Sequence, residues 1–216
     1  MIIVPVAMNA QMRIMVGPRM GYGYGYQPRH YGNNRNQRKN DFPSFKPFVS
    51  VSLGYGFPNL DKEQLPRNSY NYYQGTITQT GPVTGSIDFQ FSRLASIGVL
   101  VTHGNVSIPY YDYNAASSPA YTGKLDNWSI MLNYLSYIPV NGDKVSPYLR
   151  TAIGFNLWDQ NFTDGTGNKI NVPNTLPDLA YQLGLGVKFK ITERTGLFIE
   201  GGYGKYILHG GLSFKI

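Results

Sequence analysis

From Phe45 to the C-terminus, apolar residues alternate with small or polar ones, so that about every second side chain is aliphatic or aromatic. Successive side chains of a β-strand point to opposite faces, and a period of two therefore indicates strands with one apolar face. The pattern predicts eight strands, at residues 48–57, 83–91, 97–102, 127–134, 149–157, 182–189, 197–203 and 208–216.

The connections between these strands alternate in length. Gly204 and Lys205 predict a tight turn where a fourth long loop would otherwise lie. An even number of strands joined by alternating short and long connections predicts an all-β fold, an eight-stranded antiparallel up-and-down barrel. Short turns are expected near residues 92–96, 138–147 and 190–196, and long loops near residues 58–82, 104–123 and 158–178.

The chemistry of the two faces indicates where such a barrel resides. A soluble barrel would turn its apolar face inward, and its core would seldom hold the Gly, Ser, Thr, Asn and Gln found on the opposite face here. The pattern favours a transmembrane barrel with its apolar side outward; a soluble β-sandwich or lipocalin-like barrel is the alternative. Aromatic residues near strand ends suit the girdles at the two membrane interfaces: Tyr55, Phe57, Trp128, Tyr134 and Phe214.

Composition supports the same class of fold. Charged residues make up 14% of the chain, whereas ordinary soluble domains hold about 25%. The sequence contains no run of about 18 to 20 apolar residues, which a membrane-spanning helix requires. A soluble helical enzyme is therefore not expected.

The first 44 residues have a different character. Residues 1–10, MIIVPVAMNA, predict the rear half of a secretory signal peptide, cleaved between Ala10 and Gln11; a merely apolar N-terminus is the alternative. Residues 11–44 lack apolar periodicity and carry six basic residues against Asp41, which predicts a basic, disordered N-terminal extension. The extension is either a solvated tail or a binder of an anionic polymer, protein or lipid headgroup, and no nucleic-acid partner is expected.

Two segments carry a resemblance to a known family. The opening FVSVSLGYGF and the closing GLFIEGGYGKYILHGGLSFKI, residues 196–216, resemble the small outer-membrane β-barrel proteins of Gram-negative bacteria, the OmpA-barrel and OmpX-like porin-family group. The closing segment is similar to the final hairpin and C-terminal insertion signal of that group, although here Phe214 is not the last residue. The resemblance covers residues 45–216 and implies a barrel in the bacterial outer membrane, surrounded by lipid and lipopolysaccharide. We expect a monomer.

Four charged residues fall on the face opposite the apolar one and are expected to point into the barrel: Asp88, Arg150, Lys188 and Glu200. Their signs balance, and charges held away from bulk water need partners. Because an eight-stranded barrel is only wide enough for its own side chains, we expect a paired charge network that fills the lumen. A gated proton or ion path through that network is the alternative.

Enzymes with this architecture, such as lipid A deacylases and outer-membrane proteases, need a His beside a nucleophile or an acid. Ser213 lies four strand residues from His209, about 13 Å away and too far for a hydrogen bond. Asp159 and Asp164 lack the ligand spacing of a Ca²⁺ loop, and the absence of Cys removes thiol catalysis. We therefore expect no enzyme, metal or cofactor. The chain holds three His residues: His30, His103 and His209.

The long loops are rich in tyrosine, which provides large contact areas at low entropic cost. This predicts a structural, adhesion or surface-recognition role; the same aromatic residues could instead anchor the barrel at the lipid interface. A narrow passive pore for ions or small solutes is the alternative function. The tyrosines expected in recognition are Tyr70, Tyr72, Tyr73, Tyr110, Tyr111, Tyr113 and Tyr121.

Overall fold

A computed structural model describes residues 45–216, except residues 67–70, 115–116, 141, 143 and 173. The signal peptide predicted at residues 1–10 and the basic extension predicted at residues 11–44 lie outside the described residues. Among those that are described, no helix is both long enough and apolar enough to cross a membrane.

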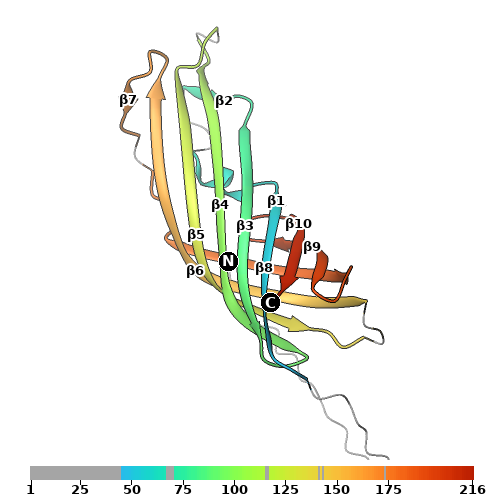
Figure 1. The fold of residues 1–216 in the computed structure, drawn as a ribbon. Coiled ribbons are helices and arrows are strands. Elements are labelled where there is room, and N and C mark those ends of the chain that lie inside the picture. Colours follow the sequence, from blue (N-terminus) through green and yellow to red (C-terminus); the bar gives the residue numbers. More distant parts are fainter. Residues whose placement is uncertain (1–44, 67–70, 115–116, 141, 143, 173) are drawn as a thin grey trace, which may run out of the picture. The chain divides into compact units, whose positions relative to one another are not determined.

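Eight antiparallel strands close into a barrel, which confirms the predicted fold (Figure 1). Each barrel strand pairs with its neighbours along the chain, and the last one returns to the first, from Ser50 opposite Lys215 to Phe57 opposite Leu208. The strands are β1 (Phe48–Phe57), β3 (Thr78–Gln90), β4 (Ala95–Asp112), β5 (Tyr121–Tyr137), β6 (Val145–Asp164), β8 (Leu179–Lys190), β9 (Thr195–Tyr203) and β10 (Leu208–Lys215).

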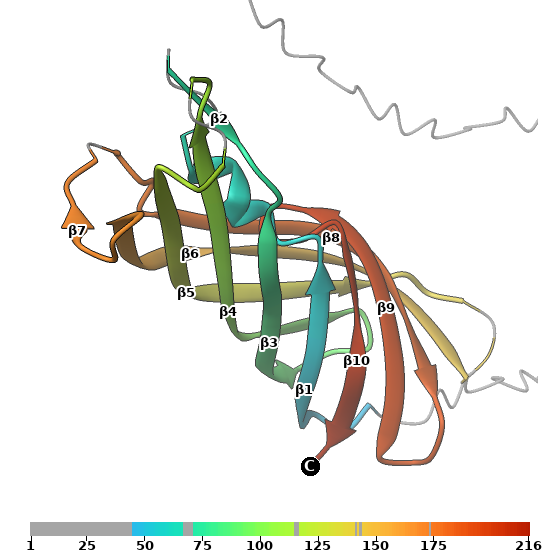
Figure 2. The ribbon, with the colours of Figure 1, turned by 90° about the horizontal axis from the view of Figure 1, so that it is seen from above.

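Three small elements are added to the barrel at the end that carries the long connections, here called the long-loop end. The short 3₁₀-helix η1 (Leu60–Gln64) lies against β4 and β5. Strand β2 (Tyr72–Gln74) pairs with the end of β4, and β7 (Lys169–Ile170) pairs with the end of β6 (Figure 2). The opposite end of the barrel is called the short-turn end.

The strands differ greatly in length. Strands β4, β5 and β6 have 18, 17 and 20 residues, whereas β9 and β10 have 9 and 8. In Figure 1 the three long strands rise beyond the ends of β1, β9 and β10. The long loops predicted at residues 104–123 and 158–178 are therefore wrong over much of their length, because they contain the ends of these strands.

The loops were predicted there because the apolar face of each strand changes sides. In β4 the outward residues are Val99 and Val101 below His103, whereas above it the apolar residues Val106 and Ile108 point inward and are completely buried. In β5 and β6 the same change occurs beyond Trp128 and Leu157, and Trp128 is paired laterally with both His103 and Leu157. We call the crown the strand parts beyond this level, residues 104–112, 121–127 and 158–164, together with β2 and β7.

The crown has an ordinary water-facing design. Most of its outward positions are polar, with Asn105 opposite Asp126 and Asp126 opposite Asp159. Its inward positions form a hydrophobic core, so that water rather than lipid is the medium that suits its outside. The buried residues of this core are Leu65, Val106, Ile108, Tyr110, Tyr121, Leu125 and Phe162.

Below the crown, every barrel strand exposes apolar side chains to the outside. The aromatic residues predicted for the girdles are all on this outward face. An apolar band around a closed sheet is the lipid-contacting surface of a transmembrane barrel. Outward residues that represent the eight strands are Leu53, Ile87, Val99, Leu132, Ile153, Leu185, Ile199 and Leu212.

Two arginine substitutions on strand β5 should distinguish the two media. Leu132→Arg lies in the middle of the apolar band and should lower the free energy of unfolding by about 2 to 4 kcal/mol, because the charge enters the hydrocarbon. Thr122→Arg lies ten residues away on the outward face of the crown and should change it by less than about 0.5 kcal/mol. Urea unfolding in lipid vesicles measures both, and equal losses would contradict the position of the boundary.

Candidate functional site

The centre of the lumen is organised around Glu200 of β9, which is 1% exposed. Its carboxylate lies 2.9 Å from Nε of Arg150, which is 2% exposed. The hydroxyls of Tyr148 and Tyr206 donate hydrogen bonds to the same carboxylate at 2.9 and 3.1 Å. Glu200 is therefore compensated by one cation and two neutral donors, as a buried charge requires.

Glycines make room for this cluster. Gly184, on the inward face of β8, lies so close to Glu200 that a Cβ atom there would meet the carboxylate at 2.5 Å. Gly186, two residues further along, lies equally close to the ring of Tyr148. Large polar side chains on one strand thus fill the space that small residues leave on the next, which accounts for the glycine-rich inner face.

Asp88 of β3 lies in the lumen as the sequence predicts and is completely buried. It accepts hydrogen bonds from the Ser86 hydroxyl at 2.8 Å and from Nδ2 of Asn133 at 2.6 Å, and it interacts electrostatically with Arg150. Arg150 pairs directly with Glu200 and acts on Asp88 only at longer range, and its Nη1 makes no hydrogen bond with any described group.

Lys188 is the one member of the predicted network that stands apart. Its Nζ lies 3.2 Å from the Tyr137 hydroxyl and about 5.5 Å from the rings of Tyr137 and Tyr148. Among the described residues it forms no ion pair with a carboxylate. The predicted pairing of Lys188 with a lumen carboxylate is wrong. Side-chain parity correctly places Lys188 inside the barrel, but its position along the barrel axis is near the short-turn end, away from Asp88 and Glu200.

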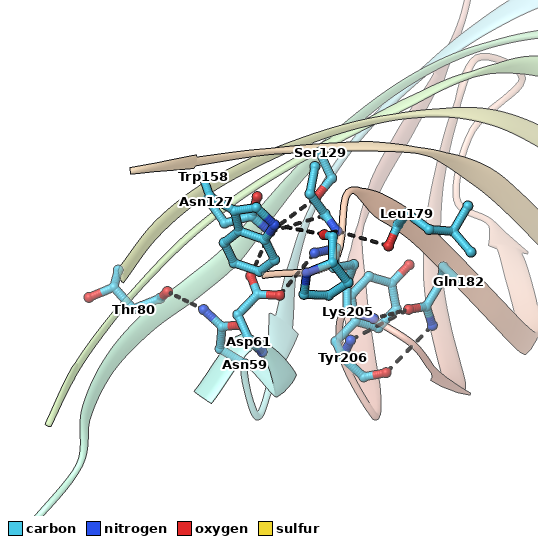
Figure 3. A network of polar contacts seen from close by, with 12 residues as sticks. Asn59, Asp61, Thr80, Asn127, Ser129, Trp158, Leu179, Gln182, Lys205 and Tyr206 are labelled. Carbon is cyan, nitrogen blue, oxygen red and sulfur yellow. Dashed lines mark hydrogen bonds and ion pairs between the residues drawn. The ribbon is translucent and has the colours of Figure 1, made fainter. Parts of the chain in front are cut away.

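A second buried ion pair was missed by the sequence prediction. Asp61 of η1 lies 2.9 Å from Nζ of Lys205, and both side chains are less than 10% exposed. Asn127 of β5 donates a hydrogen bond to the other oxygen of Asp61 at 3.0 Å (Figure 3). Burial lowers the pKa of Lys205, and the charge of Asp61 opposes this effect. Helix η1 is thus pinned inside the barrel wall at the long-loop end.

The surroundings of this pair complete the closure of the lumen. Gln182 accepts hydrogen bonds from the backbone nitrogens of Lys205 and Tyr206 at 2.7 and 3.4 Å. Asn59 caps η1 by accepting a hydrogen bond from the Asp61 nitrogen at 3.0 Å. The one sequence signal for η1 is this Asn followed by Leu-Asp-Lys-Glu-Gln, an N-cap before a polar helical turn.

The predicted recognition tyrosines divide into three groups. Tyr70 lies outside the described residues. Tyr110 and Tyr121 are 0% and 9% exposed in the crown core, with rings stacked at 4.5 Å, so their predicted exposure is wrong. Burial raises the pKa of Tyr110 to about 12 and also raises the pKa of Tyr121. Tyr72 packs edge-on against Tyr121 at 5.2 Å and belongs to the same core.

The remaining three tyrosines gather on the outside of the crown. The Tyr73 ring of β2 stacks on Tyr111 of β4 at 5.6 Å and lies 5.2 Å from Tyr113. Tyr113 is 60% exposed, and Tyr73 and Tyr111 are half-buried. We call these three residues the outer tyrosine cluster. It is held by strand pairing rather than by a free loop.

The histidines that the structure describes have separate surroundings. His209 is buried and shares a 2.6 Å hydrogen bond with the Thr84 hydroxyl, whereas the Ser213 hydroxyl donates to the Gly196 carbonyl oxygen. His103 stacks on Trp128 at 4.3 Å and lies 3.6 Å from Asp126, a neighbour that the sequence prediction missed because it lies on the adjacent strand.

Asp164, considered in the sequence as part of a calcium loop, is committed to its own turn. Its carboxylate accepts hydrogen bonds from the Thr166 hydroxyl and from the backbone nitrogens of Thr166 and Asn168. These bonds, that of the Thr166 hydroxyl above all, lower the pKa of Asp164. Within the described part of the chain, no group of three or more His, Asp or Glu residues is arranged to hold a metal ion.

No protein family model matches the sequence, and no curated protein matches it. The solved structures that are similar to this chain include two β-barrels. A transmembrane β-barrel designed de novo has a TM-score of 0.40 at 13% identity and covers 80% of this chain and 98% of its own. The second is the crystal structure of Ail, the attachment invasion locus protein of Yersinia pestis, in complex with the heparin analogue sucrose octasulfate. It has a TM-score of 0.39 at 12% identity, and the match covers 79% of this chain and 97% of the Ail chain.

Removing Arg150 should test the central network. Arg150→Leu leaves Glu200 and Asp88 buried without their cation and should cost about 3 to 5 kcal/mol of unfolding free energy. Adding Glu200→Gln should recover much of that loss, because it removes one buried charge; its amide oxygen still accepts one tyrosine hydroxyl bond, and its amide nitrogen can donate to the other tyrosine oxygen. Urea unfolding in lipid vesicles gives both values; an Arg150→Leu variant as stable as the wild type would show that this network is wrong.

Removing Lys205 should release η1 without opening the strands. Lys205→Met leaves Asp61 buried and uncompensated, so amide hydrogen exchange in residues 59–65 should rise about tenfold or more while exchange in the barrel strands stays slow. Lys62→Met, on η1 itself but away from Asp61 Oδ1, is the matched control and should leave exchange almost unchanged. Equal rates in the two variants would mean that the ion pair does not hold the helix.

Proposed function

We propose that the protein is an outer-membrane β-barrel of a Gram-negative bacterium whose crown presents a rigid recognition or adhesion surface. The observation that carries this proposal is the inversion of the apolar face at the base of the crown, level with His103, Trp128 and Leu157. A strand that is apolar outside below this level and polar outside above it suits a wall that leaves the membrane there.

The proposed topology follows from the two ends. The crown faces the outside of the cell, the short-turn end faces the periplasm, and the apolar band contacts lipid and lipopolysaccharide. This arrangement agrees with the short periplasmic turns and longer external connections of outer-membrane barrels in general. The resemblance of the opening and closing segments to the OmpA-barrel and OmpX-like group supports the same assignment.

Recognition is assigned to the outer tyrosine cluster, Tyr73, Tyr111 and Tyr113. Strand pairing between β2 and β4 holds two of these rings before any partner arrives, and the third lies against them. Preorganised aromatic side chains lose little entropy on binding and provide large contact areas. The cluster therefore suits contact with another molecule better than a mobile loop would.

The lumen argues against the passive-pore alternative. The Arg150–Glu200 cluster fills the middle of the barrel, and the Asp61–Lys205 pair holds η1 within the wall above it. Planar-bilayer recording should therefore show little or no steady conductance.

Three further statements stay predictions from sequence: the absence of enzymatic activity, the monomeric state, and the binding of an anionic polymer or protein by residues 11–44.

Adhesion should depend on the outer tyrosine cluster and not on the outward tyrosines of the apolar band. Replacing Tyr73, Tyr111 and Tyr113 by Ala should reduce attachment of displaying cells to cultured epithelial cells about tenfold, because losing such anchors costs about 1 to 2 kcal/mol or more. The matched control replaces Tyr134, Tyr181 and Tyr203, which are exposed on the band.

Surface amount and heat-modifiable migration on gels establish that each variant is folded in the membrane. Attachment that is unchanged in the correctly assembled cluster variant would overturn the adhesion proposal. The assignment of the barrel to the outer membrane is tested separately by membrane fractionation.

A further inference from the structure

The short-turn end of the barrel holds a cavity of about 520 Å³, a size that suits a small ligand. It lies among the three short turns and the ends of β1 and β10. Five basic residues line it, and Glu193 is the single acidic residue among the described residues of its lining. The basic residues are Arg93, Lys188, Lys190, Arg194 and Lys215.

Three of these cations stand on the inner face of the wall. Lys188, Lys190 and Lys215 alternate along β8 and β10 with outward Phe189 and Phe214. Lysines on the outward face of the wall would reach the lipid headgroups around the barrel. The alternation instead directs these three ammonium groups toward the mouth of the lumen.

Two of the three are held by aromatic rings rather than by carboxylates. Lys188 contacts Tyr137 and Tyr148, as described above, and Lys215 Nζ lies 4.0 Å from the centre of the Phe48 ring. Within the described residues neither forms an ion pair. Lys190 lies 3.0 Å from Glu193, but both are exposed, so that pair is weak. The mouth therefore carries excess positive charge.

We propose that this mouth binds a phosphate-bearing ligand, with the phosphate between Lys188, Lys190 and Lys215. A phosphate monoester carries a charge of about −1.5 to −2 near neutral pH and three acceptor oxygens. It therefore satisfies several ammonium groups at once, whereas a single carboxylate compensates only one. Lysine binds phosphate as a point charge and needs no fixed planar geometry.

The phosphate has two possible sources. It is either a soluble phosphorylated compound that enters the mouth from the aqueous side or the headgroup of an anionic phospholipid in the adjacent leaflet. The site lies at the opposite end of the barrel from the crown, and it stands whether or not the crown is an adhesion surface.

Calorimetric titration of the full chain in glucoside micelles with inorganic pyrophosphate tests the site. We expect one binding site in the wild type and affinity at least about tenfold weaker in Lys188→Gln/Lys215→Gln, a loss of about 1.4 kcal/mol. Lys188→Arg/Lys215→Arg should retain binding, because the charge is kept. Lys124→Gln/Lys169→Gln, on the crown, is the matched control and should bind as the wild type does.

A second titration, in nanodiscs, distinguishes the two sources. Weaker pyrophosphate binding in phosphatidylglycerol than in phosphatidylcholine discs indicates that an anionic headgroup occupies the mouth, and equal binding indicates a soluble phosphate ligand. Either result supports the site. Absence of pyrophosphate binding in glucoside micelles, or equal binding by the wild type and a folded Lys188→Gln/Lys215→Gln variant, overturns it.

Discussion

The medium outside the wall determines which face of each strand is apolar, and the rest of the structure depends on this constraint. Against lipid, the outward residues must be apolar, and polar residues are left for the lumen. Beyond His103, Trp128 and Leu157 most outward residues are polar, and the aliphatic ones pack inward around Tyr110 and Tyr121. One continuous sheet thus combines two opposite arrangements of inside and outside.

A polar lumen needs a hydrogen-bond or ion-pair partner for each of its side chains, a requirement that an apolar core does not have. Every buried polar group needs a partner, and the interior meets this need by layers: Asp88 and Glu200 around Arg150, then Asp61 with Lys205. Such layers require side chains of unequal size, which the glycines opposite Glu200 and Tyr148 allow. Filling the lumen and satisfying its charges are therefore one packing problem.

The sequence was sufficient for whatever depends on a constant period of two. The eight strands, their antiparallel order and the inward direction of Asp88, Arg150 and Glu200 follow from parity alone. Parity does not reveal the position of a side chain along the barrel axis, so the separation of Lys188 from Asp88 and Glu200 was not predictable. The crown was taken for loops because its apolar phase shifts by one residue, and the Asp61–Lys205 pair joins residues 144 positions apart that no local pattern connects.

The tight turn that joins β9 and β10 gives the barrel a front and a back. Residues 204–207 end the wall on that flank, whereas β4 to β6 continue as the crown on the other (Figure 2). Gly204 permits the abrupt reversal, with φ of +141° and no room for a side chain beside the Tyr181 carbonyl. Neighbouring molecules in the plane of the bilayer therefore meet a short wall on the side of β9 and β10 and the tall crown on the side of β4 to β6. The protein is thus asymmetric around the barrel axis as well as between its two ends.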